Sequence, residues 1–177
     1  MSEKLSLVKP REEFIEEIRA FRQEVIDVDD GLFHGVSALD DFEDISAWIR
    51  QCRLMESSET LPNPDWVDAD EFMLVREADS RILGMINLRH RLNEYLAEIG
   101  GHIGYMVRPS ERRKGYGKAM LALCLDECRE RGLDRVMISC DADNEGSRRT
   151  ILSCGGVFER SAVVDGGVIE RYWISLR

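Results

Sequence analysis

The feature that most constrains this sequence is a glycine-rich loop between a predicted strand and a predicted helix. Residues 101–108 read GHIGYMVR, a mostly apolar strand closed by Pro109, and residues 112–120 read RRKGYGKAM. An apolar run with helical spacing continues to about Arg131. The free N–H groups of a helix N-terminus bind phosphate, and glycine lets a ligand approach the backbone closely. Four cations add positive charge around the glycines: Arg112, Arg113, Lys114 and Lys118.

The loop does not match either common nucleotide-binding pattern. A Walker loop needs G-x-x-x-x-G-K-[ST], but Gly117 and Lys118 are followed by Ala119, and no glycine stands five residues before Gly117. A Rossmann loop needs a third glycine where this chain has Met120. The open alternatives are another phosphate ligand, or a tight turn before a helix whose cations are only solvated.

Strand and helix periodicities alternate along the chain in the order β-α-α-β-β-β-α-β-α-β-β. Strands are expected near residues 5–8, 71–77, 82–88, 101–108, 135–140, 157–164 and 168–176, and helices near residues 11–26, 39–52, 115–131 and 144–154. Residues 92–99 fit either a short helix or a bulging loop. The order predicts a mixed α/β sheet covered by helices, in a single domain over residues 1–177.

Composition excludes several function classes. The net charge of −10 disfavours broad binding to nucleic acid or to anionic membranes. No apolar run reaches about 18 residues and the N-terminus lacks an apolar signal region, so neither a membrane span nor a secretory signal is expected.

Five cysteines, an odd number, indicate reduced thiols and a cytoplasmic location. Cys124 and Cys128 lie one helical turn apart, but no histidine or second cysteine pair supports a metal site.

The loop resembles motif A of the GNAT superfamily, the acyl-CoA-dependent N-acyltransferases. That motif is [QR]-x-x-G-x-[GA], matched here by Arg112, Gly115 and Gly117 after a strand, and the element order is similar from about residue 5 to residue 176. The resemblance implies a GNAT-like fold, with a twisted, mostly antiparallel sheet of about seven strands and about four helices. It also implies acetyl-CoA as co-substrate. The residues implied to face pantetheine are Met106, Val107 and Arg108, and those implied to hold the pyrophosphate are Arg112, Arg113, Lys114, Gly115, Tyr116, Gly117 and Lys118.

A second segment, Asn144 to Ser147, also resembles this family. There an Asn at the end of a strand touches the pantetheine arm, while the alternative for Asn144 is a helix N-cap with Ser147 within reach. Many family members carry a Tyr seven residues after this Asn, which can protonate the departing thiolate. This chain has Ile151 at that position and no Tyr on the predicted helix. A Tyr from elsewhere (Tyr105, Tyr116 or Tyr172) or water is left as the proton donor.

The residue that deprotonates the amine is also open. Direct transfer needs a neutral amine, so a base or a water relay must take a proton. The family often places a Glu or His on the strand before the loop, which implies His102 or Glu98, with Tyr105 as a further catalytic candidate. Side chains alternate along a strand, so a shift of one residue would turn His102 to the other face.

Arg89 and His90, followed by Arg91, stand where the resemblance implies a substrate pocket. Such groups bind a carboxylate or phosphate, which would indicate an amine substrate with an anionic part, for example an amino acid. The alternative is a solvated strand end.

These observations together predict an N-acetyltransferase. It would transfer an acetyl group from acetyl-CoA to a primary amine of a small molecule or peptide, in a ternary complex. The alternatives are a non-catalytic acyl-CoA-binding or sensing module and a phosphate-sugar or nucleotide binder. The expected partners are acetyl-CoA and a small amine, with no nucleic acid and no membrane, and the expected assembly is a monomer or homodimer. The sequence does not identify the acceptor.

Overall fold

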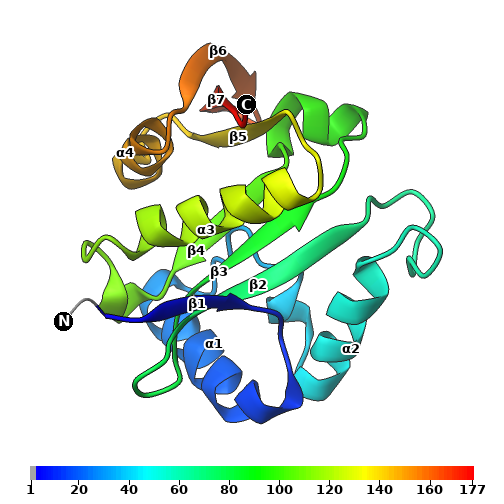
Figure 1. The fold of residues 1–177 in the computed structure, drawn as a ribbon, viewed down its shortest axis with the longest axis vertical. Coiled ribbons are helices and arrows are strands. Elements are labelled where there is room, and N and C mark those ends of the chain that lie inside the picture. The colour runs from blue at the N-terminus through cyan, green and yellow to red at the C-terminus, as the bar shows by residue number, and fades with distance from the viewer. Residues whose placement is uncertain (1–2) are drawn as a thin grey trace.

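Within residues 3–177, which the computed structural model describes, seven strands and four α-helices follow the order expected from the sequence (Figure 1). The strands are β1 Leu5–Val8, β2 Ala69–Arg76, β3 Arg81–Arg89, β4 Ile103–Val107, β5 Arg135–Asp141, β6 Val157–Val164 and β7 Gly167–Ser175. The helices are α1 Ile15–Asp29, α2 Ile45–Met55, α3 Tyr116–Glu130 and α4 Glu145–Ser153. The predicted fold class is confirmed.

The seven strands form two antiparallel sheets. The first has the order β1-β2-β3-β4 and the second the order β5-β7-β6. The sheets meet at a bridge between Gly101 and Ile138, just before β4 begins. Next to this bridge the His102 N–H donates to the Met137 carbonyl at 2.8 Å. No further pairing between β4 and β5 is formed in the described chain, so one edge of β4 is left open.

Helices cover both faces of the four-stranded sheet. Figure 1 shows α1 and α2 on one side of it, and α3 between this sheet and the other one. Alternation along each strand supplies an apolar face to each layer. The α1–α2 layer is centred on Ile18, Phe21, Trp48, Ile49, Met73 and Met85, and the α3 layer on Leu74, Leu83, Ile86, Met120, Leu121 and Cys124.

Helix α2 begins at Ile45, so the predicted start at residue 39 is wrong. Ala38 has a left-handed backbone with φ of +52°, and a short 3-10 turn follows before α2. The Asp44 side chain then caps α2 by accepting a hydrogen bond from the Ser46 N–H at 2.9 Å. Ser37 does not cap the helix, since its carbonyl accepts from the Trp48 indole at 2.7 Å.

The segment that fitted either a helix or a bulge contains a π-helical turn, Leu96–Gly100. Strand β4 begins after it at Ile103, two residues later than predicted. None of the helices of residues 3–177 is long and apolar enough to cross a membrane. All five cysteines are free thiols.

Candidate functional site

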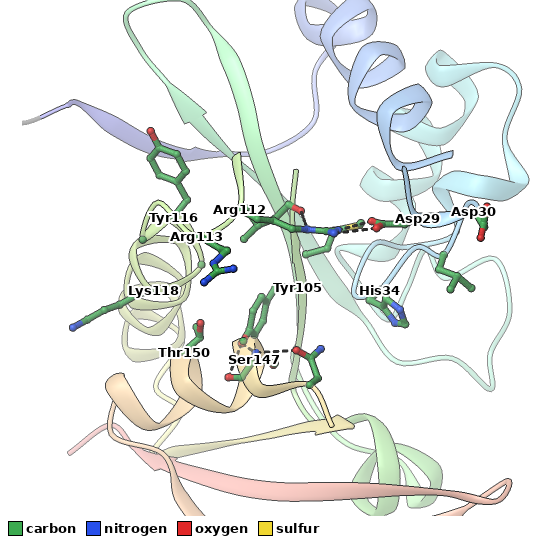
Figure 2. Close-up of a pocket in the computed structure, with 17 residues that line it drawn as sticks. Asp29, Asp30, His34, Tyr105, Arg112, Arg113, Tyr116, Lys118, Ser147 and Thr150 are labelled. Atoms are coloured by element: carbon green, nitrogen blue, oxygen red, sulfur yellow. Dashed lines mark hydrogen bonds and ion pairs between the residues drawn. The ribbon is translucent and has the colours of Figure 1, made fainter. Parts of the chain in front are cut away.

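A cavity of about 690 Å³ lies along the open edge of β4, between the glycine loop and the start of α4 (Figure 2). The end of α1 and the loop after it form the opposite wall. The lining residues are Asp29, Asp30, Leu32, His34, Tyr105, Met106, Val107, Arg112, Arg113, Gly115, Tyr116, Gly117, Lys118, Asn144, Gly146, Ser147 and Thr150. The glycine loop, β4 and the start of α4 therefore meet in one cavity.

The backbone of the glycine loop is shaped to hold an anion. Arg113 and Gly115 have positive φ angles of +63° and +89°. Left-handed residues next to right-handed ones turn successive N–H groups toward one side, which makes an anion-binding concavity. Helix α3 then starts at Tyr116 without a side-chain cap, so its first N–H groups are free for a ligand.

Gly117 leaves space for a ligand at this loop, because it has no side chain. A Cβ added there would lie 3.4 Å from Thr150 Oγ1 and 3.5 Å from Val107 Cγ2. Alanine would therefore just fit, while any longer side chain would project into the cavity. Thr150 was not predicted as a site residue, although its helical spacing of three from Ser147 places both on one face of α4.

The predicted cations divide into two groups. Arg113 and Lys118 line the cavity and form no ion pair within residues 3–177. Arg112 also lines it, but pairs with Asp29 and donates to the Val107 carbonyl at 3.3 Å. Lys114 pairs with Glu111 at 2.9 Å and does not line the cavity. Arg113 and Lys118 are thus the side chains available to a ligand's phosphates, and Lys114 is not.

The open edge of β4 presents backbone groups to the cavity. The Arg108 N–H donates to the Leu83 carbonyl, and the Arg89 N–H donates to the His102 carbonyl. Hydrogen-bonded pairs alternate along an antiparallel ladder, so the N–H and C=O groups of Tyr105 and Val107 point away from β3. An extended ligand carrying amides can pair with this edge as an added strand would.

The Tyr105 hydroxyl lies within the cavity beside α4. It is 2.9 Å from Ser147 Oγ, and Ser147 N–H donates to the Asn144 side chain at 3.0 Å (Figure 2). Asn144 is therefore an N-cap that also lines the cavity. Burial raises the pKa of Tyr105 to about 12, so its hydroxyl keeps its proton at neutral pH.

The structure turns His102 away from this cavity. Its Nδ1 accepts a hydrogen bond from the Met137 N–H at 3.0 Å, and its ring contacts Trp173 edge-on. Burial lowers the pKa of His102 to about 4, and the positive charges of Arg89 and Arg135 add to this shift. Since Nδ1 is occupied, the neutral ring carries its proton on Nε2 and has no free lone pair for an amine proton. This geometry favours a structural role over the expected role as a base.

Glu98 and Arg108 also lie outside the cavity. Glu98 is exposed and pairs with Arg160 of β6. The Arg108 side chain is only 4% exposed and pairs with Glu17 and Glu24 of α1. Arg108 was expected to face the ligand, but alternation turns it to the α1 side of the sheet.

Arg89 and His90 point to different sides of the sheet at the end of β3, which finishes at Arg89. Arg89 lines a second, smaller cavity. His90 points to the other face, with its ring nitrogens 2.9 Å from Asp68 Oδ2 and 2.8 Å from Asp70 Oδ2. Hydrogen bonding to Asp70 raises the pKa of His90, which lies in a cluster with Asp68 and Asp70. Its expected role in substrate binding is not supported.

Several cavity residues were not found from the sequence. Asp29, Asp30, Leu32 and His34 come from the end of α1 and the loop after it, far from the glycine loop in sequence. Nothing in their local pattern marks them, because only the fold brings them to β4. Over residues 3–177, no three His, Cys, Asp or Glu side chains are arranged to hold a metal ion.

The arrangement suits a long ligand with an anionic end and an amide-containing arm. The anion would lie at the start of α3 between Arg113 and Lys118, and the arm along Tyr105 and Val107 toward the first turn of α4. The end of the arm would then lie next to a hydroxyl that can give up a proton.

Comparisons with known proteins agree with this reading. The family model described as "Acetyltransferase (GNAT) family" matches residues 39–155. No curated protein sequence is significantly similar to the chain. Solved structures share the fold at low identity. Microcin C7 self-immunity acetyltransferase MccE, in complex with acetyl-CoA and AMP, has a TM-score of 0.70 at 19% identity, covering 98% of this chain and 93% of its own.

Two further structures resemble the chain over nearly its whole length. The ribosomal-protein-S5-alanine acetyltransferase from Vibrio fischeri has a TM-score of 0.72 at 15% identity, covering 99% of this chain and 94% of its own. RimL, the ribosomal L7/L12 α-N-protein acetyltransferase in complex with coenzyme A, has a TM-score of 0.71 at 14% identity, covering 98% of this chain and 95% of its own.

Proposed function

The chain belongs to the acetyltransferase (GNAT) family, and we propose that it transfers an acetyl group from acetyl-CoA to a primary amine in a ternary complex. One observation carries the proposal. A single cavity runs from the anion-binding loop before α3, along the open edge of β4, to the Tyr105 hydroxyl. We propose a single acetyltransferase domain over residues 1–177.

Each part of the cavity matches one part of acetyl-CoA. The start of α3, with Arg113 and Lys118, would hold the pyrophosphate through N–H groups and positive charge. Tyr105 and Val107 would pair with the amides of the pantetheine arm. The structures of MccE and RimL contain acetyl-CoA and coenzyme A, which supports this ligand for a chain of the same fold.

Tyr105 supplies the proton that the leaving group needs. The amine nitrogen bonds to the acetyl carbon, the C–S bond breaks, and the thiolate takes the Tyr105 hydroxyl proton. Tyr105 then regains a proton from water, and the nitrogen releases its surplus proton to solvent. Backbone N–H groups on the β4 edge polarise the thioester carbonyl, so catalysis rests mainly on positioning and electrostatic stabilisation.

The experiment is a thermal shift with acetyl-CoA and coenzyme A, comparing wild type with Gly117→Asp. The substitution would place a carboxylate against the pyrophosphate, while the contacts of the added Cβ allow the protein to fold. Wild type should gain about 2.7 kcal/mol at a hundredfold excess of ligand over its Kd, and Gly117→Asp should gain little. Ala122→Asp is the matched control, because it adds the same charge to an exposed position of α3 outside the cavity. No shift in folded wild type would overturn the proposal.

A non-catalytic acyl-CoA-binding module is the second candidate. The observation that favours it is Ile151, which is fully buried in the core where many family members have a Tyr. Adding amines to protein and acetyl-CoA separates the two candidates. Release of coenzyme A thiol only when an amine is present supports the enzyme. Binding of acetyl-CoA without thiol release, whichever amine is added, supports the non-catalytic module.

A further inference from the structure

A second cavity, of about 250 Å³, lies on the α1–α2 side of the four-stranded sheet. Its polar floor is formed by Ser37, Asn87 and Arg89, and its apolar wall includes Trp66, Tyr95 and Leu96. It shares no lining residue with the first cavity, and nothing in the proposed acetyl-CoA site uses it.

The polar floor reaches the strand that carries the first cavity. Glu71 pairs with Asn87 across β2 and β3, and Asn87 pairs with Gly104 across β3 and β4. A Cβ added to Gly104 would lie 3.8 Å from the NH2 group of Arg89. Since Tyr105 follows Gly104, an amine held at this floor lies next to the strand on which the thioester would lie.

Arg89 is a guanidinium without a carboxylate partner. Its NH1 group donates to the carbonyls of Gly100 and Gly101 at 3.2 and 3.0 Å. No Asp or Glu oxygen of residues 3–177 lies within 4.0 Å of it, and its Nε and NH2 groups donate to no described residue. A half-buried cation is costly to leave unpaired, so these donors indicate an anionic ligand.

Glu71 lies behind the Ser37 and Asn87 part of this floor and does not itself line the cavity. Glu71 is only 3% exposed, and its Oε2 accepts from the Ser37 N–H at 3.1 Å and from Asn87 Nδ2 at 3.0 Å. Its Oε1 is buried without a partner. Asn87 Nδ2 also donates to Ser37 Oγ at 2.8 Å, while Asn87 Oδ1 accepts from no described residue. These oxygens form a site for a hydrogen-bond donor.

An ammonium at this end would stabilise the ionised form of Glu71. Burial raises the pKa of Glu71 to about 7, while hydrogen bonds from Ser37 and Asn87 and the charge of Arg89 favour its ionised form. A cation held at Ser37 and Asn87 would favour the ionised form further. The floor thus offers oxygen acceptors at Ser37 and Asn87, backed by Glu71, and the free donors of Arg89.

We propose that the second cavity binds the acceptor of the acetyl group as a free apolar α-amino acid, with its ammonium at Ser37 and Asn87, backed by Glu71, and its carboxylate on Arg89. The apolar side chain packs against Trp66 and Tyr95. This rests on the proposed function. A peptide N-terminus fits less well, because it presents a neutral amide where Arg89 has free donors. The ammonium first gives one proton to solvent, and the neutral nitrogen bonds to the acetyl carbon. The C–S bond breaks, the thiolate takes the Tyr105 hydroxyl proton, which water replaces, and the nitrogen gives its second surplus proton to solvent.

The experiment measures thiol release from acetyl-CoA with L-leucine, L-phenylalanine and the corresponding amides, leucinamide and phenylalaninamide. Wild type should prefer the free acids. Arg89→Gln should lower kcat/KM for the free acids by about tenfold or more, the range for losing one charge-assisted contact, and leave the amides nearly unchanged. Arg50→Gln is the matched control, because Arg50 is exposed and pairs with Asp44 outside the cavity.

The outcomes separate this proposal from the proposed function. Equal rates for acids and amides in wild type, or an equal loss for both in Arg89→Gln, overturn the assignment of Arg89. Absence of thiol release with all four compounds, while acetyl-CoA still raises the Tm, overturns the amino-acid acceptor and leaves the acetyl-CoA site in place. Absence of any Tm shift with acetyl-CoA is the failure of the proposed function instead.

Discussion

At the scale of single residues, Tyr105 tests the proton-donating step. Its hydroxyl bonds to Ser147 Oγ at 2.9 Å, and its raised pKa, about 12, keeps the proton available. Tyr105→Phe should lower kcat by about 10²-fold, the lower range for losing a general acid, and leave acetyl-CoA binding close to wild type. Thiol release and thermal shift, measured side by side, check both halves of this prediction.

Tyr172→Phe is the control for that change. Burial also raises the pKa of Tyr172 to about 12, but its hydroxyl donates to Glu170 at 2.6 Å outside the cavity. The acetyl-transfer activity of Tyr172→Phe should stay near that of wild type. Equal activity of Tyr105→Phe and wild type would contradict a proton-donating role and favour water as the donor.

At the scale of elements, Arg108 fixes α1 against the end of β4. Its buried guanidinium pairs with Glu17 and Glu24 and donates to the Ile82 carbonyl at 3.2 Å. Removing one partner of a buried ion pair leaves charges uncompensated, so Arg108→Met should cost about 3 kcal/mol of unfolding free energy. Chemical denaturation measures this cost, and the Tm shift with acetyl-CoA should persist, because Arg108 does not line the cavity.

Arg19→Met provides the matched comparison on α1. Arg19 is exposed and pairs with Glu16 within the same helix, so its loss should cost about 0.5 kcal/mol or less. Similar costs for the two changes would mean that Arg108 does not hold α1 in place.

Elements set by local pattern were predictable, and partners distant in sequence were not. The loop from Arg113 to Gly117 and the helix after it follow from glycines, cations and an apolar run that are close together in the sequence. The role of Arg108 could not be predicted, because Glu17 and Glu24 lie on a helix near the other end of the chain. The start of α2 at Ile45 was not predicted either, since Ala38 takes a left-handed backbone and Asp44 caps the helix.

At the scale of the whole molecule, His102 connects the two sheets through its reciprocal hydrogen bonds with Met137. Its pKa falls from an ordinary value near 6.5 to about 4, so the folded state disfavours the charged ring. The stability from this neutral ring is fully present above about pH 6.5 and is lost as the pH falls toward 4. The loss amounts to about 3 kcal/mol at most, at 1.36 kcal/mol per pKa unit.

Glu71 opposes His102 over nearly the same pH range. Its pKa rises from 4.5 to about 7, so the folded state holds a proton that the unfolded chain has lost, and stability increases as the pH falls from 7 to 4.5. The two contributions partly cancel in wild type. The His102→Asn variant keeps an acceptor for the Met137 N–H but has no ring to titrate. Of these two pH-dependent contributions, it should retain only that of Glu71. Its stability should therefore increase relative to wild type as the pH falls from 6.5 to 4.5. Thermal melts across this range test the difference, and parallel curves for the two proteins would contradict it.

The division into two sheets explains why the site exists. Alternating patterns predicted seven strands, but not that β4 and β5 would stop pairing after Gly101 and Ile138. Pairing between strands depends on contacts across the fold, which a strand's own residues do not encode. The separation leaves the Tyr105–Val107 edge free for a ligand.

That same edge makes the ligand-free protein a template for other chains. Unpaired N–H and C=O groups along a strand are where foreign strands add, and this is a route to aggregation. The chain shields part of the edge, because the Arg112 side chain donates to the Val107 carbonyl at 3.3 Å. A coenzyme arm lying along β4 would act as a fifth strand of the first sheet. Filling the site would then protect the protein from self-association as well as prepare it for catalysis.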